Sequence, residues 1–88
     1  MSIKVNTGPL LSQSTNKQQI VEVNGNTVGE CLRNLVEQFP RLKLFEKDGQ
    51  LLAYIEIYIN GESAYPQELD KPVKDGDELS IILMIDGG

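Results

Sequence analysis

The stretch that decides the fold is TVGECLRNLVEQFP, residues 27–40. Thr27 and Glu30 have the spacing of a capping box, in which two side chains bond backbone amides at the start of a helix. Apolar side chains then recur at helical spacing until Pro40, which disfavours helical geometry in the residue before it. The stretch therefore predicts an amphipathic helix over residues 28–39. Its apolar face consists of Val28, Cys31, Leu32, Leu35, Val36 and Phe39.

Two strands are predicted before this helix. Residues 3–6 and 19–24 alternate apolar and polar side chains, as a strand does when only one of its faces is buried. Residues 7–18 between them are mostly polar and contain a Gly-Pro pair, which predicts a loop. We therefore expect the two strands to form a hairpin ahead of the helix.

Three strands are predicted after the helix. Residues 54–59 place isoleucines on one face, and an Asn-Gly turn follows them. Residues 63–73 predict a short edge strand plus a loop, because their two prolines exclude a central strand. Residues 79–85 predict the last strand. Residues 41–53 are expected to form a short helical turn or an irregular segment under the core.

Together these elements predict an α+β fold of the β-grasp type, a mixed sheet with one main crossover helix. A right-handed crossover brings the chain back beside the hairpin, so the first and last strands can pair in parallel at the centre. A chain of 88 residues has the size of one compact domain. We expect a single domain over residues 1–88, with a flexible tail at residues 86–88. The side chains expected to form its core are Leu32, Leu35, Ile57 and Ile81.

The composition excludes several classes of protein. The net charge of -5 opposes binding to nucleic acid, because that partner requires a basic patch. The longest apolar run, residues 81–85, is far too short to cross a membrane. The single cysteine excludes an internal disulfide, and no apolar segment of signal-peptide length follows Met1. We expect a cytoplasmic protein without nucleic-acid or membrane partners.

No catalytic group and no metal site is predicted. Cys31 falls on the apolar face of the helix, where a free cysteine behaves as a small buried hydrophobe. The carboxylates of Asp75, Asp77 and Glu78 lack the pattern of a calcium loop and are expected to form a solvated turn. No phosphate-binding loop, nucleophile-base pair or zinc spacing is present. The chain is therefore expected to be a protein substrate and not an enzyme.

Four segments of the chain together resemble the MoaD/ThiS family of ubiquitin-like sulfur carriers. They are TVGECL (27–32), IYINGE (57–62), VKDGDELSI (73–81) and the final Gly87-Gly88. Their order and spacing extend the resemblance over nearly the whole chain. The family usually carries proline and small residues before its two glycines, whereas this sequence has Met84-Ile85-Asp86 there. That departure leaves the fold prediction intact and leaves the choice of partner open.

The resemblance implies that the working group of this chain is the C-terminal carboxylate of Gly88. In the family, an adenylyltransferase of the ubiquitin-activating type uses ATP to convert this carboxylate to an acyl-adenylate, and sulfur then displaces AMP. The resulting thiocarboxylate donates sulfur to a synthase in molybdopterin, thiamine or cysteine biosynthesis. The chain itself would bind no cofactor. Three extended residues, 86–88, span roughly 10 Å. Because glycine has no Cβ, a Gly-Gly tail can enter a narrow channel.

A partner surface is predicted next to this tail. Side chains that suit a partner fall on the strand face opposite the helix, namely Tyr54, Tyr58, Ile82 and Met84. The predicted binding segment continues through Ile85, Asp86 and Gly87. One other class of function stays open, a ubiquitin-like protein modifier whose tail forms isopeptides, or a non-catalytic interaction domain.

Overall fold

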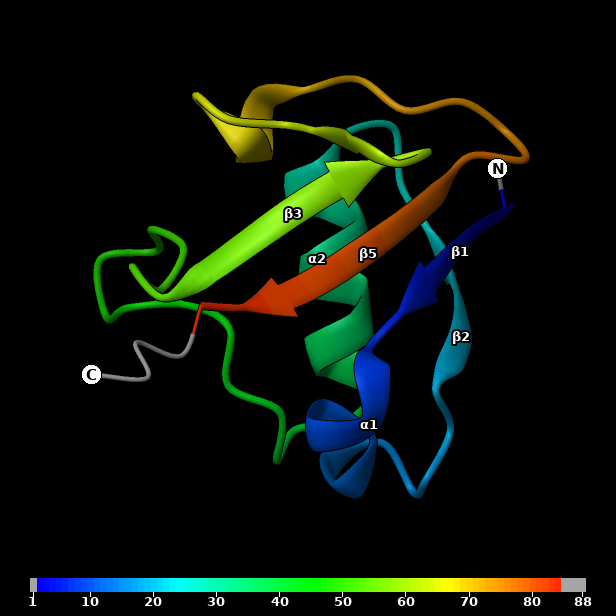
Figure 1. Cartoon of the computed structure of the whole chain (residues 1–88), viewed down its shortest axis with the longest axis vertical. Helices are drawn as coiled ribbons and strands as arrows, with labels where there is room; N and C mark the ends of the chain where they lie inside the picture. The colour runs from blue at the N-terminus through cyan, green and yellow to red at the C-terminus, as the bar shows by residue number, and fades with distance from the viewer. Residues whose placement is uncertain (1, 85–88) are drawn as a thin grey trace.

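The structure, a computed structural model, describes residues 2–84 as a mixed sheet with its main helix lying across one face (Figure 1). The strands are, in chain order, β1 (Ser2–Asn6), β2 (Ile20–Asn24), β3 (Ile55–Ile59), β4 (Glu62–Ser63) and β5 (Glu78–Leu83). The α-helices are α1 (Gly8–Leu11) and α2 (Val28–Gln38), and the 3-10 turns are η1 (Ser12–Ser14) and η2 (Glu68–Asp70).

The sheet order, β2-β1-β5-β3-β4, confirms the predicted α+β fold of the β-grasp type. β1 and β2 form the expected antiparallel hairpin, and β1 pairs in parallel with β5 at the centre. β3 lies antiparallel on the other side of β5, with Ile55 opposite Leu83. The end of β5 therefore lies beside the start of β3, which is where the chain continues toward its C-terminus.

The helix α2 starts and ends close to the predicted residues. The Glu30 amide donates to Thr27 Oγ1 at 3.2 Å, which is one half of the predicted capping box. The other half is shifted by one residue, because Glu30 Oε1 accepts from the amide of Asn26 at 2.9 Å. The helix ends at Gln38, and Phe39 before the proline is its cap.

The core lies between α2 and the inner face of the sheet. All four side chains expected there are buried, with Leu32 and Leu35 on the helix and Ile57 and Ile81 on the sheet. Burial of each such side chain contributes about 1.5–3 kcal/mol relative to exposure. α2 thus covers the inner face of the sheet, and the opposite face carries exposed side chains such as Ile82.

The loop predicted over residues 7–18 is wrong, because this segment contains α1 and η1. Pro9 stands in the first turn of α1, where an amide would have no helical partner. The Asn6 side chain accepts from the Gly8 amide at 3.0 Å, and the Ser12 hydroxyl donates to Pro9 C=O at 2.9 Å. These local bonds supply helical structure that polar composition conceals.

The remaining segments follow the predictions more closely. Residues 41–53 are irregular apart from one isolated bridge between Phe45 and Leu51. The edge strand predicted over residues 63–73 is limited to the two residues of β4, and η2 follows it. No helix among residues 2–84 is long and apolar enough to cross a membrane.

Candidate functional site

Three exposed apolar side chains gather on the face of the sheet opposite α2, next to the end of β5. Tyr54, Ile82 and Met84 are 52%, 45% and 49% exposed, and we call them the outer patch. Strand alternation explains the arrangement, because Ile55 and Ile81 beside them turn inward to the core. Exposed apolar groups that lie together on a sheet are typical of protein-binding surfaces.

Backbone pairing between β3 and β5 holds the outer patch in place. Ile82 lies opposite Glu56, so the patch spans both strands. The Met84 amide donates to Tyr54 C=O at 2.7 Å, which continues the ladder one residue beyond β5. The backbone is therefore fixed up to Met84, the last residue that the structure describes.

Tyr58, the fourth side chain predicted for this surface, also lies on the outer face but is partly buried. The neighbouring Glu56 carboxylate, through its charge and a hydrogen bond, raises the pKa of the Tyr58 phenol. Tyr58 extends the outer patch with a polar end.

The other predicted site residues lie outside the described part of the chain. They are Ile85, Asp86, Gly87 and Gly88. In the sequence these four residues follow Met84 directly. The described part of the chain thus ends within the outer patch, at Met84.

Cys31 is fully buried under the sheet, as its position on the apolar helix face predicts. Burial, followed by the charge of Glu30, raises the pKa of the Cys31 thiol to about 11. A thiol needs exposure and a lowered pKa to react at neutral pH. Cys31 is therefore a core residue in this fold.

The turn before β5 is structural, which corrects the prediction that its carboxylates are all solvated. Asp77 is buried, where its Oδ2 accepts from the Lys74 amide at 2.9 Å and its Oδ1 from the Asn60 side chain at 3.0 Å. These two hydrogen bonds hold the pKa of the Asp77 carboxyl below its usual value. Within residues 2–84, no three His, Cys, Asp or Glu side chains are grouped closely enough to hold a metal ion.

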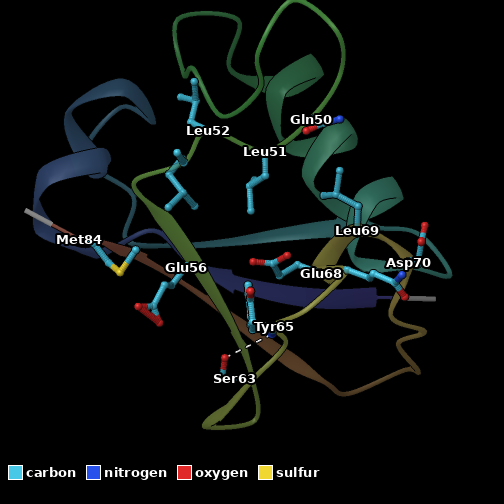
Figure 2. Close-up of a pocket in the computed structure, with 13 residues that line it drawn as sticks. Gln50, Leu51, Leu52, Glu56, Ser63, Tyr65, Glu68, Leu69, Asp70 and Met84 are labelled. Carbon is cyan, nitrogen blue, oxygen red and sulfur yellow. Dashed lines mark hydrogen bonds between the residues drawn. The ribbon is translucent and has the colours of Figure 1, made fainter.

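A groove of about 840 Å³ beside β3 was not predicted (Figure 2). Its walls come from the segment before β3, from β3 itself, from β4 and η2, and from Met84. The only sequence signal was a set of apolar side chains, Leu51, Leu52, Tyr65 and Leu69, in segments interpreted as loops. Their meeting depends on tertiary structure, because the lining residues are spread over the sequence from Gln50 to Met84.

Comparison with known proteins identifies a matching family model and several relatives of this chain. The ThiS family model matches residues 5–88. A putative sulfur carrier protein of Archaeoglobus fulgidus is 38% identical over 47 residues, which cover 52% of this chain and only 53% of that protein. Small archaeal modifier protein 1 of Haloferax volcanii is 38% identical over 71 residues, covering 77% of this chain and 78% of that protein.

The fold is shared with solved structures of the same kind. A chain in the crystal structure of the Amycolatopsis orientalis BexX/CysO complex superposes with a TM-score of 0.86 at 30% identity. The superposition covers 98% of this chain and 99% of that chain. That chain belongs to a structure of a two-protein complex.

Proposed function

Since the chain belongs to the ThiS family, we propose that it is a sulfur carrier whose working group is the terminal carboxylate of Gly88. A partner adenylyltransferase of the ubiquitin-activating type activates this carboxylate with ATP, and a synthase then accepts the sulfur. The chain acts as a protein substrate in both steps. Molybdopterin, thiamine and cysteine biosynthesis are the pathways in which such a donor is used, and the setting is the cytoplasm.

The chemistry divides into two displacements. A carboxylate oxygen of Gly88 attacks the α-phosphorus of ATP, so that pyrophosphate leaves and a mixed anhydride with AMP forms. Sulfide then attacks the carbonyl carbon, and AMP leaves with one of the original carboxylate oxygens. The product is a thiocarboxylate, and no electrons are gained or lost when the donor is sulfide. Activation is needed because the carboxylate has no usable leaving group of its own.

One observation carries the proposal, the anchoring of Met84 at the border of the outer patch. The 2.7 Å hydrogen bond to Tyr54 C=O fixes the backbone there, next to exposed apolar side chains. Four residues follow Met84 in the sequence, and four extended residues span at most roughly 14 Å. A partner bound to the outer patch can therefore receive the Gly88 carboxylate in a narrow site, where side chains at 87 and 88 would obstruct entry.

Asp86 introduces a second carboxylate close to the proposed reaction. Two negative charges near the phosphates of ATP oppose binding unless the partner neutralises one of them. We therefore expect a lysine or arginine of the adenylyltransferase to pair with Asp86. Asp86→Asn should then lower the affinity for that enzyme and reduce its dependence on salt.

Intact-protein mass spectrometry tests the proposal. The chain is incubated with the adenylyltransferase of its own organism, ATP and sulfide, and a parallel reaction omits ATP. The expected product has one oxygen replaced by sulfur, localised to the C-terminal peptide and dependent on ATP. An unmodified C-terminus in the complete reaction, or modification elsewhere, would refute the sulfur-carrier function.

A second candidate function, protein modification, is favoured by the similarity to Small archaeal modifier protein 1 over 77% of this chain. In this case the activated Gly88 carbonyl would be transferred to a lysine amine, forming an isopeptide. The last lysine or arginine of the chain is Lys74, so trypsin would leave residues 75–88 attached to each target lysine. Peptides carrying this remnant in cell extracts would support modification, and their absence in cells that accumulate the thiocarboxylate would exclude it.

A further inference from the structure

The groove beside β3 is fixed by the fold on two of its walls (Figure 2). On one wall the Leu52 amide donates to Leu44 C=O at 2.9 Å, and Leu52 C=O accepts from the Ile55 amide at 3.0 Å. Another wall is η2, which packs against α2 so closely that a Cβ on Gly29 would lie 3.0 Å from the Leu69 carbonyl oxygen. The groove is therefore present in the folded chain before anything binds to it.

The lining of the groove combines apolar and acidic side chains. Its more accessible aliphatic side chains are those of Leu51, Leu52, Leu69 and Met84. Its carboxylates are those of Glu56, Glu68 and Asp70. No lysine or arginine is among the described residues that line it, so no positive charge of the described groove offsets these carboxylates. The lining thus matches a ligand that carries both apolar groups and a positive charge.

Among the three carboxylates, that of Glu68 points into the groove. Figure 2 shows the Glu68 side chain running from η2 toward β3, whereas the Asp70 side chain lies farther from β3. Glu68 is also partly buried, and Asp70 is exposed. A charge that is partly shielded from water attracts an opposite charge more strongly than one in bulk solvent. Glu68 is therefore the main charged group that a ligand in the groove would meet.

Arginine fits this lining better than lysine does. Its guanidinium is weakly hydrated, pairs with a carboxylate through two parallel hydrogen bonds and stacks on aromatic rings. Tyr65, which is exposed, lines the same groove. The aliphatic stem of arginine packs on apolar surface while its head stays polar. The groove measures about 840 Å³, which is a size typical of sites that hold several chemical groups, so apolar neighbours of the arginine can enter as well.

We propose that this groove receives a segment of a partner protein in which an arginine lies between apolar residues, with its guanidinium paired to Glu68. The neighbouring apolar side chains pack on Leu51 and Leu69. Charge complementarity selects such a segment, since the groove is acidic and the net charge of the chain is -5. Met84 belongs to both the outer patch and the groove, so the segment is assigned to the partner that covers the outer patch, and this assignment alone rests on the proposed function.

The test uses a capped Gly-Leu-Arg-Leu-Gly peptide titrated into the isotope-labelled chain and followed by nuclear magnetic resonance. Saturable shifts are expected for the amides of Leu51, Glu68 and Leu69, which line the groove. The control peptide carries citrulline in place of arginine, which keeps the shape of the side chain and removes its charge. It should bind about tenfold more weakly, because it cannot form a charge-assisted pair with Glu68. A lysine peptide should fall between the two, because an ammonium group cannot form the paired hydrogen bonds.

Matched charge variants locate the guanidinium. Glu68→Gln should weaken binding of the arginine peptide about tenfold, because the paired carboxylate is lost. Asp70→Asn removes the same charge two residues away, and Glu22→Gln removes it on β2, where the side chain is exposed. Both controls should leave binding within about threefold, since an exposed charge contributes little. None of the three side chains belongs to the core, so the amide spectrum of each variant should keep the pattern of the folded chain.

The proposal is overturned if the arginine peptide causes no saturable shifts, or if the citrulline or lysine peptide binds as tightly as the arginine peptide. Equal effects of Glu68→Gln and Asp70→Asn would also overturn it, and so would shifts confined to Tyr54 and Ile82, which would place the peptide on the outer patch. The experiment contains neither ATP nor an adenylyltransferase, so its failure leaves the sulfur-carrier proposal untouched. Conversely, failure to form a thiocarboxylate removes only the assignment of the segment to that partner and leaves the peptide result standing.

Discussion

The side chain of Asp77 links two segments by hydrogen bonds, the turn at Asn60 that follows β3 and the turn that precedes β5. Its carboxylate accepts from the Lys74 amide and the Asn60 side chain, and Asn60 Oδ1 in turn accepts from the Glu78 amide at 3.0 Å. An asparagine at position 77 replaces one of the two accepting oxygens with an NH2 donor, so it cannot keep both bonds in this geometry. The charged carboxylate is thus the form that the fold stabilises.

Asp77→Asn should therefore lower stability in a pH-dependent way. The pKa of the folded Asp77 carboxyl lies below its ordinary value of 3.8, so its stabilising effect is complete above that pH. The effect is lost as the pH falls through the lower, folded pKa. The difference in thermal unfolding midpoint between wild type and variant should be large at neutral pH and shrink below pH 3.8. A difference that stays constant with pH, or an equal effect of the exposed control Glu22→Gln, would contradict this.

Met84 tests the outer patch as a partner surface. Met84→Lys places a charge among exposed apolar side chains, so binding to the adenylyltransferase should weaken on the order of tenfold or more. The unfolding free energy should change by less than about 0.5 kcal/mol, because the side chain is at the surface. Leu10→Lys is the matched control, since Leu10 is similarly exposed but lies on α1, away from β3. Titration calorimetry measures the affinities, and equal losses in both variants would reject the patch.

The secondary structure elements differ in how far the sequence predicts them, and the difference has a physical cause. α2 is long, capped and strongly periodic, so its position is predicted within one residue at its C-terminal end. α1 has four residues and is held by side-chain bonds from Asn6 and Ser12 that leave no periodic pattern. The strands are predictable because alternation distinguishes their faces, and the same alternation predicts that Tyr54, Ile82 and Met84 are exposed.

Leu35 tests the packing of α2 on the sheet. Leu35→Ala should reduce the free energy of unfolding by about 2–5 kcal/mol, because a cavity remains where the fully buried side chain was. For a chain of 88 residues this is a large part of the total stability. Glu37→Ala in the same helix is the control and should cost less than about 0.5 kcal/mol. Denaturant titration measures both, and a small loss at Leu35 would mean that α2 does not form the core.

At the scale of the whole molecule, the outer patch and the groove differ in how far the sequence predicts them, because only the outer patch follows from a local pattern. The outer patch depends on two adjacent strands and their alternation, both visible in the sequence. The groove depends on where an irregular segment, η2 and β3 meet, and no local pattern encodes that meeting. Met84 belongs to the outer patch and also lines the groove, so the two surfaces meet at this residue.

Under the proposed function the length of the tail is critical, because the hydrogen bond to Tyr54 C=O fixes the Met84 backbone and the reaction requires the carboxylate at one position. Deleting Gly88 moves the carboxylate back by roughly 3.5 Å relative to the anchored strand. A misplacement of about 1 Å can already cost on the order of 100-fold in rate, so thiocarboxylate formation should become undetectable.

An alanine added after Gly88 should also abolish thiocarboxylate formation, for a different reason. It converts the reacting carboxylate of Gly88 into an amide, and the new terminal carboxylate lies one residue beyond the position that the reaction requires. Neither change touches a buried residue among positions 2–84, so both variants should unfold at the wild-type midpoint and bind the adenylyltransferase with affinity within about tenfold of wild type. Mass spectrometry of the complete reaction measures thiocarboxylate, and release of pyrophosphate measures the first step. Transfer that survives the deletion at the wild-type rate would show that the distance between the outer patch and the terminus does not control the reaction, and the anchoring of Met84 would then lose its role.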